Sequence, residues 1–417
     1  MYVDRLELND FRSYQTVSLD IGPGVSLFVG PNGNGKTNLV EAVEYISTLS
    51  SHRVATEAPL VRAGQQQAIV RAGVVAGLED DRRLLLELEL NHGRANHARI
   101  NRSALRRVRD ITGALRTVVF SPDDLAIVKG EPSDRRGFID ALVATRWPRM
   151  AGVKADYERV IRQRNALLKS LGGRRRHLDE ATAGTLDVWD EQLIATGAEL
   201  LEARLDTLSS LMGPVRDSYA TIAPVKNVAE AHYKSSLPGL VDMLEAGGDQ
   251  PGESHSGATP STPQLAALLH AGLQARRGEE VARGVSLVGP HRDDITLIIG
   301  GLPAKGYASH GESWSLALAL RLGSLRLLRS EAVEPVLILD DVFAELDVVR
   351  RNRLAEVVGG AEQALITAAV DSDVPSSLST RRFAVTMVEE PDGKRLSSVD
   401  PPVSTEAVDQ DVDNDQQ

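Results

Sequence analysis

Cysteine is absent from the 417-residue chain, which excludes a disulfide scaffold, a thiolate metal site and a cysteine nucleophile. Aromatic residues make up only 4%, so a core must consist mainly of Leu, Val, Ile and Ala. Long apolar runs are also missing: the run at residues 336–339 is far too short to cross a bilayer. The N-terminal residues include acids and lack the apolar segment of a signal peptide. These absences predict a cytoplasmic protein of the reducing cytosol.

The chain also has no excess of positive charge. The chain has 47 basic and 58 acidic residues, a net charge of −11, which at first argues against a nucleic-acid partner. Residues 388–417, however, hold nine acids and two bases and so account for −7 of that charge. Because this segment also has few large apolar residues, we expect a disordered acidic tail over residues 389–417.

Basic residues gather in two places. Residues 94–109 contain six arginines and no acid, and residues 174–176 are three consecutive arginines. Such runs form either a solvated face or a surface for a phosphate backbone. The candidates for DNA contacts are Arg99, Arg102, Arg106, Arg107 and Arg109.

Hydrophobic periodicity predicts an α/β segment, a mostly helical insertion and a second α/β segment. We expect strands at residues 2–8, 17–21, 25–29, 84–90, 98–101, 117–120, 285–288, 295–299, 336–339 and 364–367. The helical patterns cover residues 38–49, about 135–168, 186–211, 265–275 and 312–328. The resulting domains are a head (1–134 and 280–388) and a helical arm lobe (135–279) with a flexible loop (247–263).

A glycine-rich motif follows the strand predicted at residues 25–29. It fits the phosphate-loop pattern, in which backbone N–H groups and the N-terminus of the next helix bind phosphates. Lys36 is expected to reach the β- and γ-phosphates, and the Thr37 hydroxyl to bind Mg²⁺. The predicted nucleotide-binding residues are Gly30, Pro31, Asn32, Gly33, Asn34, Gly35, Lys36 and Thr37.

Two acids end the apolar strand at residues 336–339. Asp340 is expected to hold the metal, and Asp341 to orient or deprotonate the attacking water. Alone this motif is weak, but together with the phosphate loop it predicts one ATP site assembled from two distant segments.

Residues 309–312 open a predicted helix. Ser309 followed three residues later by Glu312 is a capping-box pattern. A second role is open, in which Ser309 and Gly311 bind a phosphate at the helix N-terminus. The residue pattern alone favours the simple cap.

Taken together, these motifs resemble the ABC-type ATPase heads of SMC-like proteins and, within that group, the RecF family of bacterial recombinational repair proteins. The stretches that carry the resemblance are residues 10–14, 30–39, 51–53, 120–130, 289–294 and 339–347.

The resemblance implies an α/β, ABC-type P-loop ATPase head with ATP and Mg²⁺ as ligands. It implies that Ser309 and Gly311 contact the γ-phosphate bound to the other protomer, and that Asp347 faces the partner site. It further implies an ATP-dependent homodimer that clamps duplex or gapped DNA and cooperates with RecR and RecO. Hydrolysis would be weak, DNA-stimulated and a release switch.

The sequence departs from other ATPases of this kind. Asp341 stands where transporter ATPases carry Glu, residues 367–369 lack their His, and His310 and Glu312 replace Gln-rich positions. The first two departures indicate slow turnover. The glutamine that senses the γ-phosphate is not identified, and residues 121–124 are a guess for its place. Two alternatives remain: the energy-coupling subunit of a membrane transporter, and an SMC-like nuclease or its partner.

Overall fold

The computed structural model describes residues 1–54, 56–171, 180–223, 227–246, 259–378, 380–389, 395–401 and 403–404. The chain divides into two compact units, Met1–Asp124 with Ser324–Gln417, and Leu125–Gly323. The first unit therefore consists of two segments that are distant in sequence. The second unit extends to residue 323, whereas the arm lobe was predicted to end at residue 279.

The first unit contains a six-stranded antiparallel sheet with the order β2-β1-β4-β5-β6-β7. Leu6 and Leu8 alternate with more exposed residues along β1 and are fully buried. Leu8 lies opposite Val17 on β2 and Val70 on β4, so the apolar faces coincide. The strands are β1 (Tyr2–Phe11), β2 (Tyr14–Asp20), β4 (Gln67–Gly77), β5 (Asp80–Asn91), β6 (His97–Ile100) and β7 (Ser103–Ala104).

A second, seven-stranded sheet in the same unit has the order β15-β14-β3-β13-β12-β8, with β16 paired to β14. The strands from β14 to β8 run parallel to one another. β12 and β13 are buried along their whole length, as is typical of parallel strands covered on both faces. The strands are β3 (Gly24–Val29), β8 (Thr117–Phe120), β12 (Val336–Asp340), β13 (Gln363–Ala368), β14 (Thr380–Glu389), β15 (Arg395–Val399) and β16 (Val403–Ser404).

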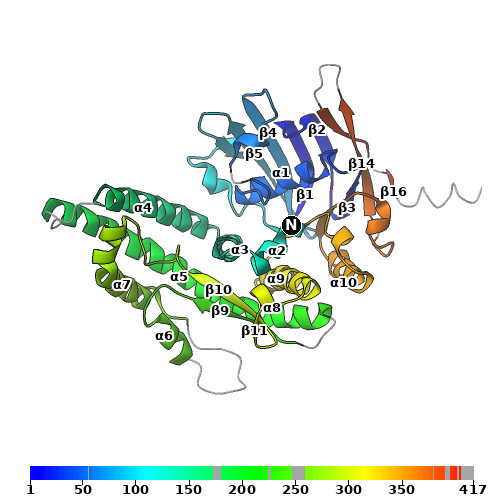
Figure 1. The fold of residues 1–417 in the computed structure, drawn as a ribbon. Coiled ribbons are helices and arrows are strands. Elements are labelled where there is room, and N and C mark those ends of the chain that lie inside the picture. Colours follow the sequence, from blue (N-terminus) through cyan, green and yellow to red (C-terminus); the bar gives the residue numbers. More distant parts are fainter. Residues whose placement is uncertain are drawn as a thin grey trace, which may run out of the picture. The chain divides into compact units, whose positions relative to one another are not determined.

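Helix α1 (Lys36–Thr48) lies between the two sheets. It contacts β1, β4 and β5 of the first sheet and β8, β12 and β13 of the second (Figure 1). Leu39, Val43 and Ile46 are fully buried in one core shared by both sheets. The remaining helical elements of the unit are α10 (Val348–Gly359), η1 (Ala58–Leu60), η2 (Val108–Ile111), η3 (Pro122–Asp124), η4 (Phe343–Glu345) and η5 (Asp371–Asp373).

The second unit is mostly helical, with a three-stranded antiparallel sheet ordered β11-β10-β9. Helices α4, α5 and α7 pack together around a core that includes Tyr157, Leu201 and Leu269. Helix α9 (His310–Ser330) starts in this unit and ends in the first. The other elements are α2 (Leu125–Lys129), α3 (Pro132–Arg146), α4 (Arg149–Leu171), α5 (Glu180–Ile222), α6 (Leu240–Ala246), α7 (Thr262–Arg283), α8 (Ala304–Tyr307), β9 (Ala229–Lys234), β10 (Asp294–Ile299) and β11 (Leu302–Pro303). Within the described ranges, none of the helices combines the length and apolar character needed to span a membrane.

Three expectations need correction. Residues 285–288 are not a strand but an irregular connection, whose Ser286 carbonyl accepts hydrogen bonds from Arg292. The predicted tail (389–417) is not disordered throughout, because β15 and β16 pair with β14. The predicted loop (247–263) ends earlier than expected, because Ser261 caps α7; residues 247–258 lie outside the described residues.

Candidate functional site

The predicted phosphate loop connects β3 to α1. Gly33 and Gly35 have φ angles of 89° and 102°, values that favour glycine. A Cβ atom at Gly35 would also lie 2.4 Å from Ser397 Oγ. The Lys36 side chain is buried and donates from Nζ to Asn32 Oδ1 at 3.2 Å and to the Pro31 carbonyl at 3.5 Å. A loop with left-handed glycines, no room for a Cβ atom at Gly35 and a buried ammonium at its centre fits a polyphosphate.

Two hydroxyl groups hold Asp340 at the end of β12. Thr37 Oγ1 donates to Asp340 Oδ1 at 2.8 Å, and Thr367 Oγ1 donates to the same oxygen at 2.7 Å. Burial raises the pKa of Asp340, but the nearby His52 ring and the hydrogen bonds from Thr367 and Thr37 outweigh this effect and lower it. Asp340 is thus held as a carboxylate beside Thr37. A carboxylate and a hydroxyl next to a phosphate loop form the oxygen set that suits Mg²⁺.

Asp341 adopts a left-handed conformation with a φ angle of 51°, which is uncommon for a residue other than glycine. Its N–H donates to Thr367 Oγ1 at 2.9 Å, which fixes this turn of the chain. Burial raises the pKa of Asp341, Lys36 lowers it, and the negative charges of Asp340 and Asp373 raise it further. The two adjacent acids therefore differ: Asp340 stays ionised, whereas Asp341 binds a proton more readily, as a general base requires.

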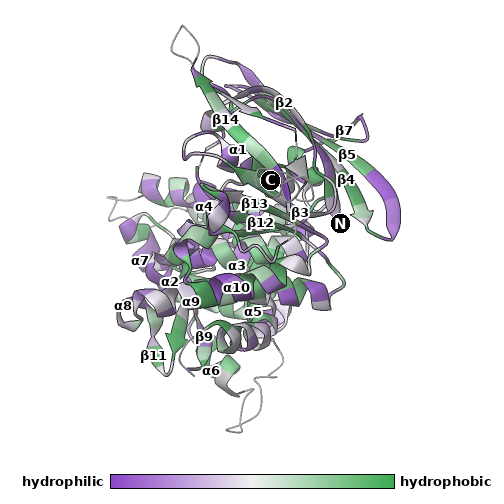
Figure 2. Cartoon of the chain, turned by 90° about the vertical axis from the view of Figure 1, so that its right-hand side faces the viewer, coloured by the Kyte–Doolittle hydropathy of each residue, from purple (hydrophilic) through white to green (hydrophobic). Residues whose placement is uncertain are grey.

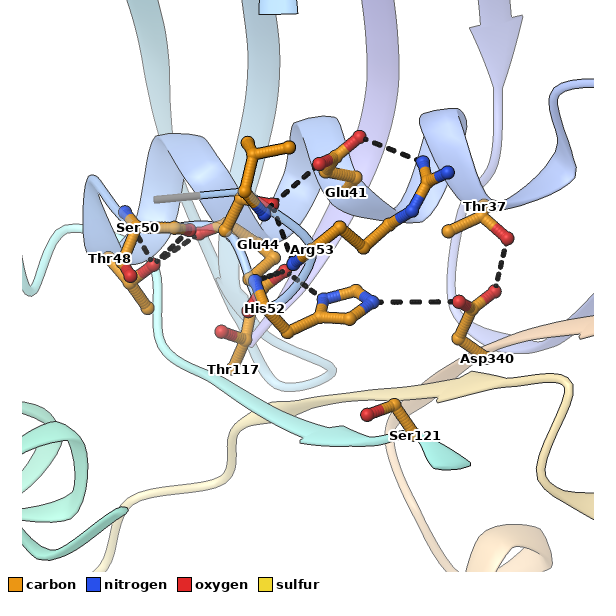
Figure 3. A network of polar contacts seen from close by, with 12 residues as sticks. Thr37, Glu41, Glu44, Thr48, Ser50, His52, Arg53, Thr117, Ser121 and Asp340 are labelled. Carbon is orange, nitrogen blue, oxygen red and sulfur yellow. Dashed lines mark hydrogen bonds and ion pairs between the residues drawn. The ribbon is translucent and has the colours of Figure 1, made fainter. Parts of the chain in front are cut away.

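His52 lies between Glu44 and Asp340 (Figure 3). Its Nδ1 is 2.5 Å from Glu44 Oε2, and its Nε2 is 3.6 Å from Asp340 Oδ2. Burial lowers the pKa of His52, but the neighbouring carboxylate of Asp340 and the hydrogen bond to Glu44 raise it to about 10. Sequence reasoning did not assign His52 to this site. In the sequence, only its place in the Ser51-His52-Arg53 stretch pointed to His52. Its partner Asp340, at the end of β12, is distant in sequence.

Arg12 and Arg53 share the buried carboxylate of Glu41 on α1. Arg12 donates from Nε and NH2 at 2.8 and 2.5 Å, and Arg53 donates from NH1 at 3.3 Å. Arg53 NH1 also donates to Asn38 Oδ1 at 2.9 Å. Figure 3 shows Arg53 beside Glu41 on α1. This cluster adds positive charge beside the loop, and sequence reasoning assigned neither arginine to the site.

The segment predicted as tail supports the phosphate loop. Ser397 on β15 donates from Oγ to Ser13 Oγ at 2.6 Å, and Ser13 Oγ accepts from Asn38 Nδ2 at 2.8 Å. Asn34 Nδ2 donates to the Val385 carbonyl on β14 at 3.1 Å. β14 and β15 therefore position the loop.

Ser309 and Gly311 lie at the start of α9, in the second unit. Glu312 Oε2 accepts from the Ser309 N–H at 3.0 Å and from its hydroxyl at 2.8 Å. These two hydrogen bonds lower the pKa of Glu312. The carboxylate thus points back to cap the helix, while Ser309 is exposed. Any contact of Ser309 and Gly311 with a phosphate on another protomer stays a prediction.

Asp347 caps α10. Its Oδ1 accepts from the Arg350 N–H at 2.9 Å, and its carboxylate pairs with the Arg350 guanidinium. The next two residues, Val348 and Val349, are 68% and 58% exposed. The expected role of Asp347 opposite a partner stays a prediction.

The arginines proposed for DNA contact differ in their surroundings. Arg99 on β6 pairs with Glu87 and lies 3.8 Å from Glu89, so its charge is largely neutralised. Arg102, Arg106 and Arg107 are exposed, and Arg109 is half-buried in η2. The residues at 174–176 lie outside the described residues.

The stretch at residues 289–294 lies in the second unit. His291 Nδ1 accepts from the Tyr157 hydroxyl at 2.7 Å, and Asp294 pairs with Arg135 at 2.7 Å. Asp293 accepts from the Ser236 N–H at 2.7 Å. His291 therefore fixes a turn.

A phosphate-loop motif between β3 and α1, with Asp340 at the end of β12 hydrogen-bonded to Thr37, is the arrangement found in ATPase heads of the ABC and SMC class. The fold agrees: the Smc head domain of Pyrococcus furiosus matches with a TM-score of 0.53 at 15% identity, covering 100% of both chains. Residues 2–391 match the family model described as "RecF/RecN/SMC N terminal domain". The chain belongs to the RecF family.

Curated relatives carry the description "DNA replication and repair protein RecF". The protein of Cutibacterium acnes is 59% identical over 92% of this chain and 96% of its own length. That of Streptomyces avermitilis is 54% identical over 92% of this chain and 98% of its own. Among solved structures, "the recombination mediator protein RecF-ATPrS in RecFOR pathway" matches with a TM-score of 0.78 at 26% identity. It covers 95% of this chain and 98% of that one.

Proposed function

We propose that this protein is an ATP-dependent DNA-binding switch of replication and recombinational repair. The observation that carries the proposal is the group formed by buried Lys36, Thr37 and Asp340, with Thr37 Oγ1 2.8 Å from Asp340 Oδ1. This group joins the two distant motifs into one site for a nucleotide. The solved structure named with a bound ATP analogue shares the fold and supports this assignment.

Each residue of the site has a separate role in this proposal. Lys36 and the N–H groups of the loop would bind the phosphates, and Thr37 and Asp340 would hold Mg²⁺. When bound, Mg²⁺ neutralises charge on the phosphates. Asp341 takes the proton of the attacking water, because its pKa is raised while that of Asp340 is lowered. The short side chain of Asp341 and the threonine at position 367 suit slow hydrolysis, so that the enzyme is a weak, DNA-stimulated ATPase.

Dimerisation completes the site. Ser309 is exposed at the N-terminus of α9, and Glu312 is turned back as a cap. The N-terminus of α9 is thereby left for a γ-phosphate held by a second protomer. Exposed Val348 and Val349, next to Asp347, add an apolar patch that a partner would cover.

DNA binding follows from pairing of the heads. Arg102, Arg106, Arg107 and Arg109 provide charge for phosphate contacts, which give affinity without sequence preference. Arg99 contributes less, because glutamates already pair with it. The named pathway of the related structure supports RecR and RecO as partners in loading recombinase on gapped DNA. The match to the RecF/RecN/SMC family favours this function over a transporter subunit.

Fluorescence anisotropy of labelled gapped duplex DNA, with and without ATP, tests the proposal. Lys36→Ala should abolish the nucleotide-dependent part of DNA binding, and Asp341→Asn should preserve binding and slow its release. Arg82→Ala, which removes an exposed arginine paired with Asp80, is the matched control and should behave like the wild type. Nucleotide-dependent DNA binding by Lys36→Ala at the wild-type level would contradict the proposal.

A further inference from the structure

A groove on the first unit lies beside the start of α10. It has a volume of about 430 Å³ and is lined by residues from β3, α10, β14 and the connection between β13 and β14. Its lining residues include the apolar Leu27, Val348, Val374 and Leu378, the arginines Arg351 and Arg382, and one acid, Asp371.

The groove combines an apolar floor with cationic groups. Arg351 donates from Nε to the Phe343 carbonyl at 3.1 Å and from NH2 to the Leu346 carbonyl at 3.3 Å. Within the described part of the chain, no acidic side chain pairs with Arg351. Arg382 pairs with Asp371 at 3.2 Å, but its buried Nε makes no hydrogen bond to any described residue. α10 combines hydrophobic and hydrophilic residues along its length (Figure 2). An occupant should therefore be extended, acidic and partly apolar.

The chain itself leads to this groove. β16 runs antiparallel to β14, with Val403 opposite Arg382 and Ser404 opposite Arg381. If this antiparallel register continued beyond Ser404, the chain would run toward Thr380 and Leu378. Both of these residues line the groove. The chain therefore leaves its last described strand at the mouth of the groove.

The sequence that follows has the required chemistry. Residues 405–417, which lie outside the described residues, contain five acids and no base, together with one alanine and two valines. In an extended form this segment reaches about 40 Å, more than the groove needs. Its negative charge complements Arg351, and its valines suit the apolar floor.

We propose that this groove binds the acidic segment 405–417 of the same chain. Val348 directly follows Asp347, so a bound segment covers the start of α10. If the proposed function holds, on which this last step rests, the segment competes with a second protomer for that surface. The acidic segment then restrains ATP-dependent dimerisation.

Peptide binding without nucleotide tests the groove itself. The protein is the full chain in which the five acids of segment 405–417 are replaced by their amides (E406Q, D409N, D411N, D413N and D415N). A fluorescent peptide of residues 405–417 should bind it at least about fivefold more tightly than the peptide with the same amide replacements. Binding should weaken as salt is raised.

Variants of the protein locate the site. Arg351→Gln should weaken binding at least about fivefold, and Arg353→Gln, on the same helix but outside the groove lining, should not. Val348→Asp gives an independent check, because this exposed residue tolerates the change and its charge repels the peptide. Equal binding of both peptides, or no effect of Arg351→Gln and Val348→Asp, would overturn the proposal. A dimer of the amide variant in sedimentation without nucleotide would assign the groove to a second copy and would also overturn it.

Light scattering with ATP tests the competition. The amide variant should dimerise at a protein concentration at least about fivefold lower than the wild type. Equal midpoints would refute the competition. No ATP-dependent dimer of either protein would instead contradict the proposed function, while peptide binding would still support the groove.

Discussion

Thr367 connects the two acids of the site, and its replacement by valine gives a sharp prediction. The side chain is buried; its hydroxyl donates to Asp340 Oδ1 at 2.7 Å and accepts from the Asp341 N–H at 2.9 Å. Valine has nearly the same shape, so Thr367→Val removes two hydrogen bonds without opening a large cavity. A hydrogen bond to a charged group contributes about 1.5–3 kcal/mol, and an unpaired buried N–H costs about 1–3 kcal/mol. Because the remaining groups relax in part, we expect a loss of about 2–4 kcal/mol in the free energy of unfolding.

Urea denaturation of the nucleotide-free protein, followed by circular dichroism, measures this loss as a lower midpoint at unchanged slope. Thr386→Val is the matched control, because Thr386 lies on β14 and its exposed hydroxyl bonds only to Ser398 Oγ among the described residues. The control should lose less than about 1 kcal/mol. A loss for Thr367→Val no greater than that of Thr386→Val would refute the role assigned to Thr367.

Three further predictions concern the loop, the buried charges and acid stability. Gly35→Ala should lower the thermal midpoint and abolish nucleotide binding, because its Cβ would meet Ser397 Oγ at 2.4 Å. At Gly33 a Cβ atom would meet open space, so Gly33→Ala should lower the free energy of unfolding by only about 1–2 kcal/mol, because of the positive φ. Equal effects of the two substitutions would contradict the packing argument. Arg164 is fully buried between Asp190 and Glu280, at 2.7 and 2.6 Å. Arg164→Met should cost about 3–5 kcal/mol in urea denaturation, whereas exposed Arg159→Met should cost less than about 1 kcal/mol. Burial lowers the pKa of His291 from 6.5 to about 4, although a hydrogen bond to Ser286 raises it. The folded protein thus favours neutral His291, and this stabilisation is complete above pH 6.5 and lost as the pH falls toward 4. His291→Gln should lose less stability over that interval than the wild type, and parallel losses would count against this cause.

The central site was predictable because each half is contiguous in sequence. The glycines and Lys36 form one motif, and Asp340 and Asp341 end a continuous apolar run whose burial the structure confirms. The capping role of Glu312 was predictable for the same reason, because its partner Ser309 is only three positions away.

The parts that sequence reasoning missed depend on tertiary contacts. β15 is polar and lies in an acidic, proline-rich segment, so composition predicted disorder; pairing with β14 and the bond from Ser397 to Ser13 hold it in place. In sequence, residues 285–288 resemble a buried strand. In the structure, Arg164 donates to the Ser286 hydroxyl and Arg292 donates to the Ser286 carbonyl, so that this carbonyl does not pair with a strand. His52 gave no local sign of its contact with Asp340, because that contact joins residues on distant segments.

A mixing experiment tests the central claim, that two protomers complete each other's site, most directly. Lys36→Ala destroys the phosphate loop but keeps Ser309, and Ser309→Arg blocks the start of α9 but keeps the loop. Each variant alone should show no DNA-stimulated ATP hydrolysis. An equimolar mixture should recover about a quarter of the wild-type rate, because half of the dimers formed at random are mixed and each has one intact site. A mixture as inactive as the separate variants, or full activity of Ser309→Arg alone, would contradict the claim.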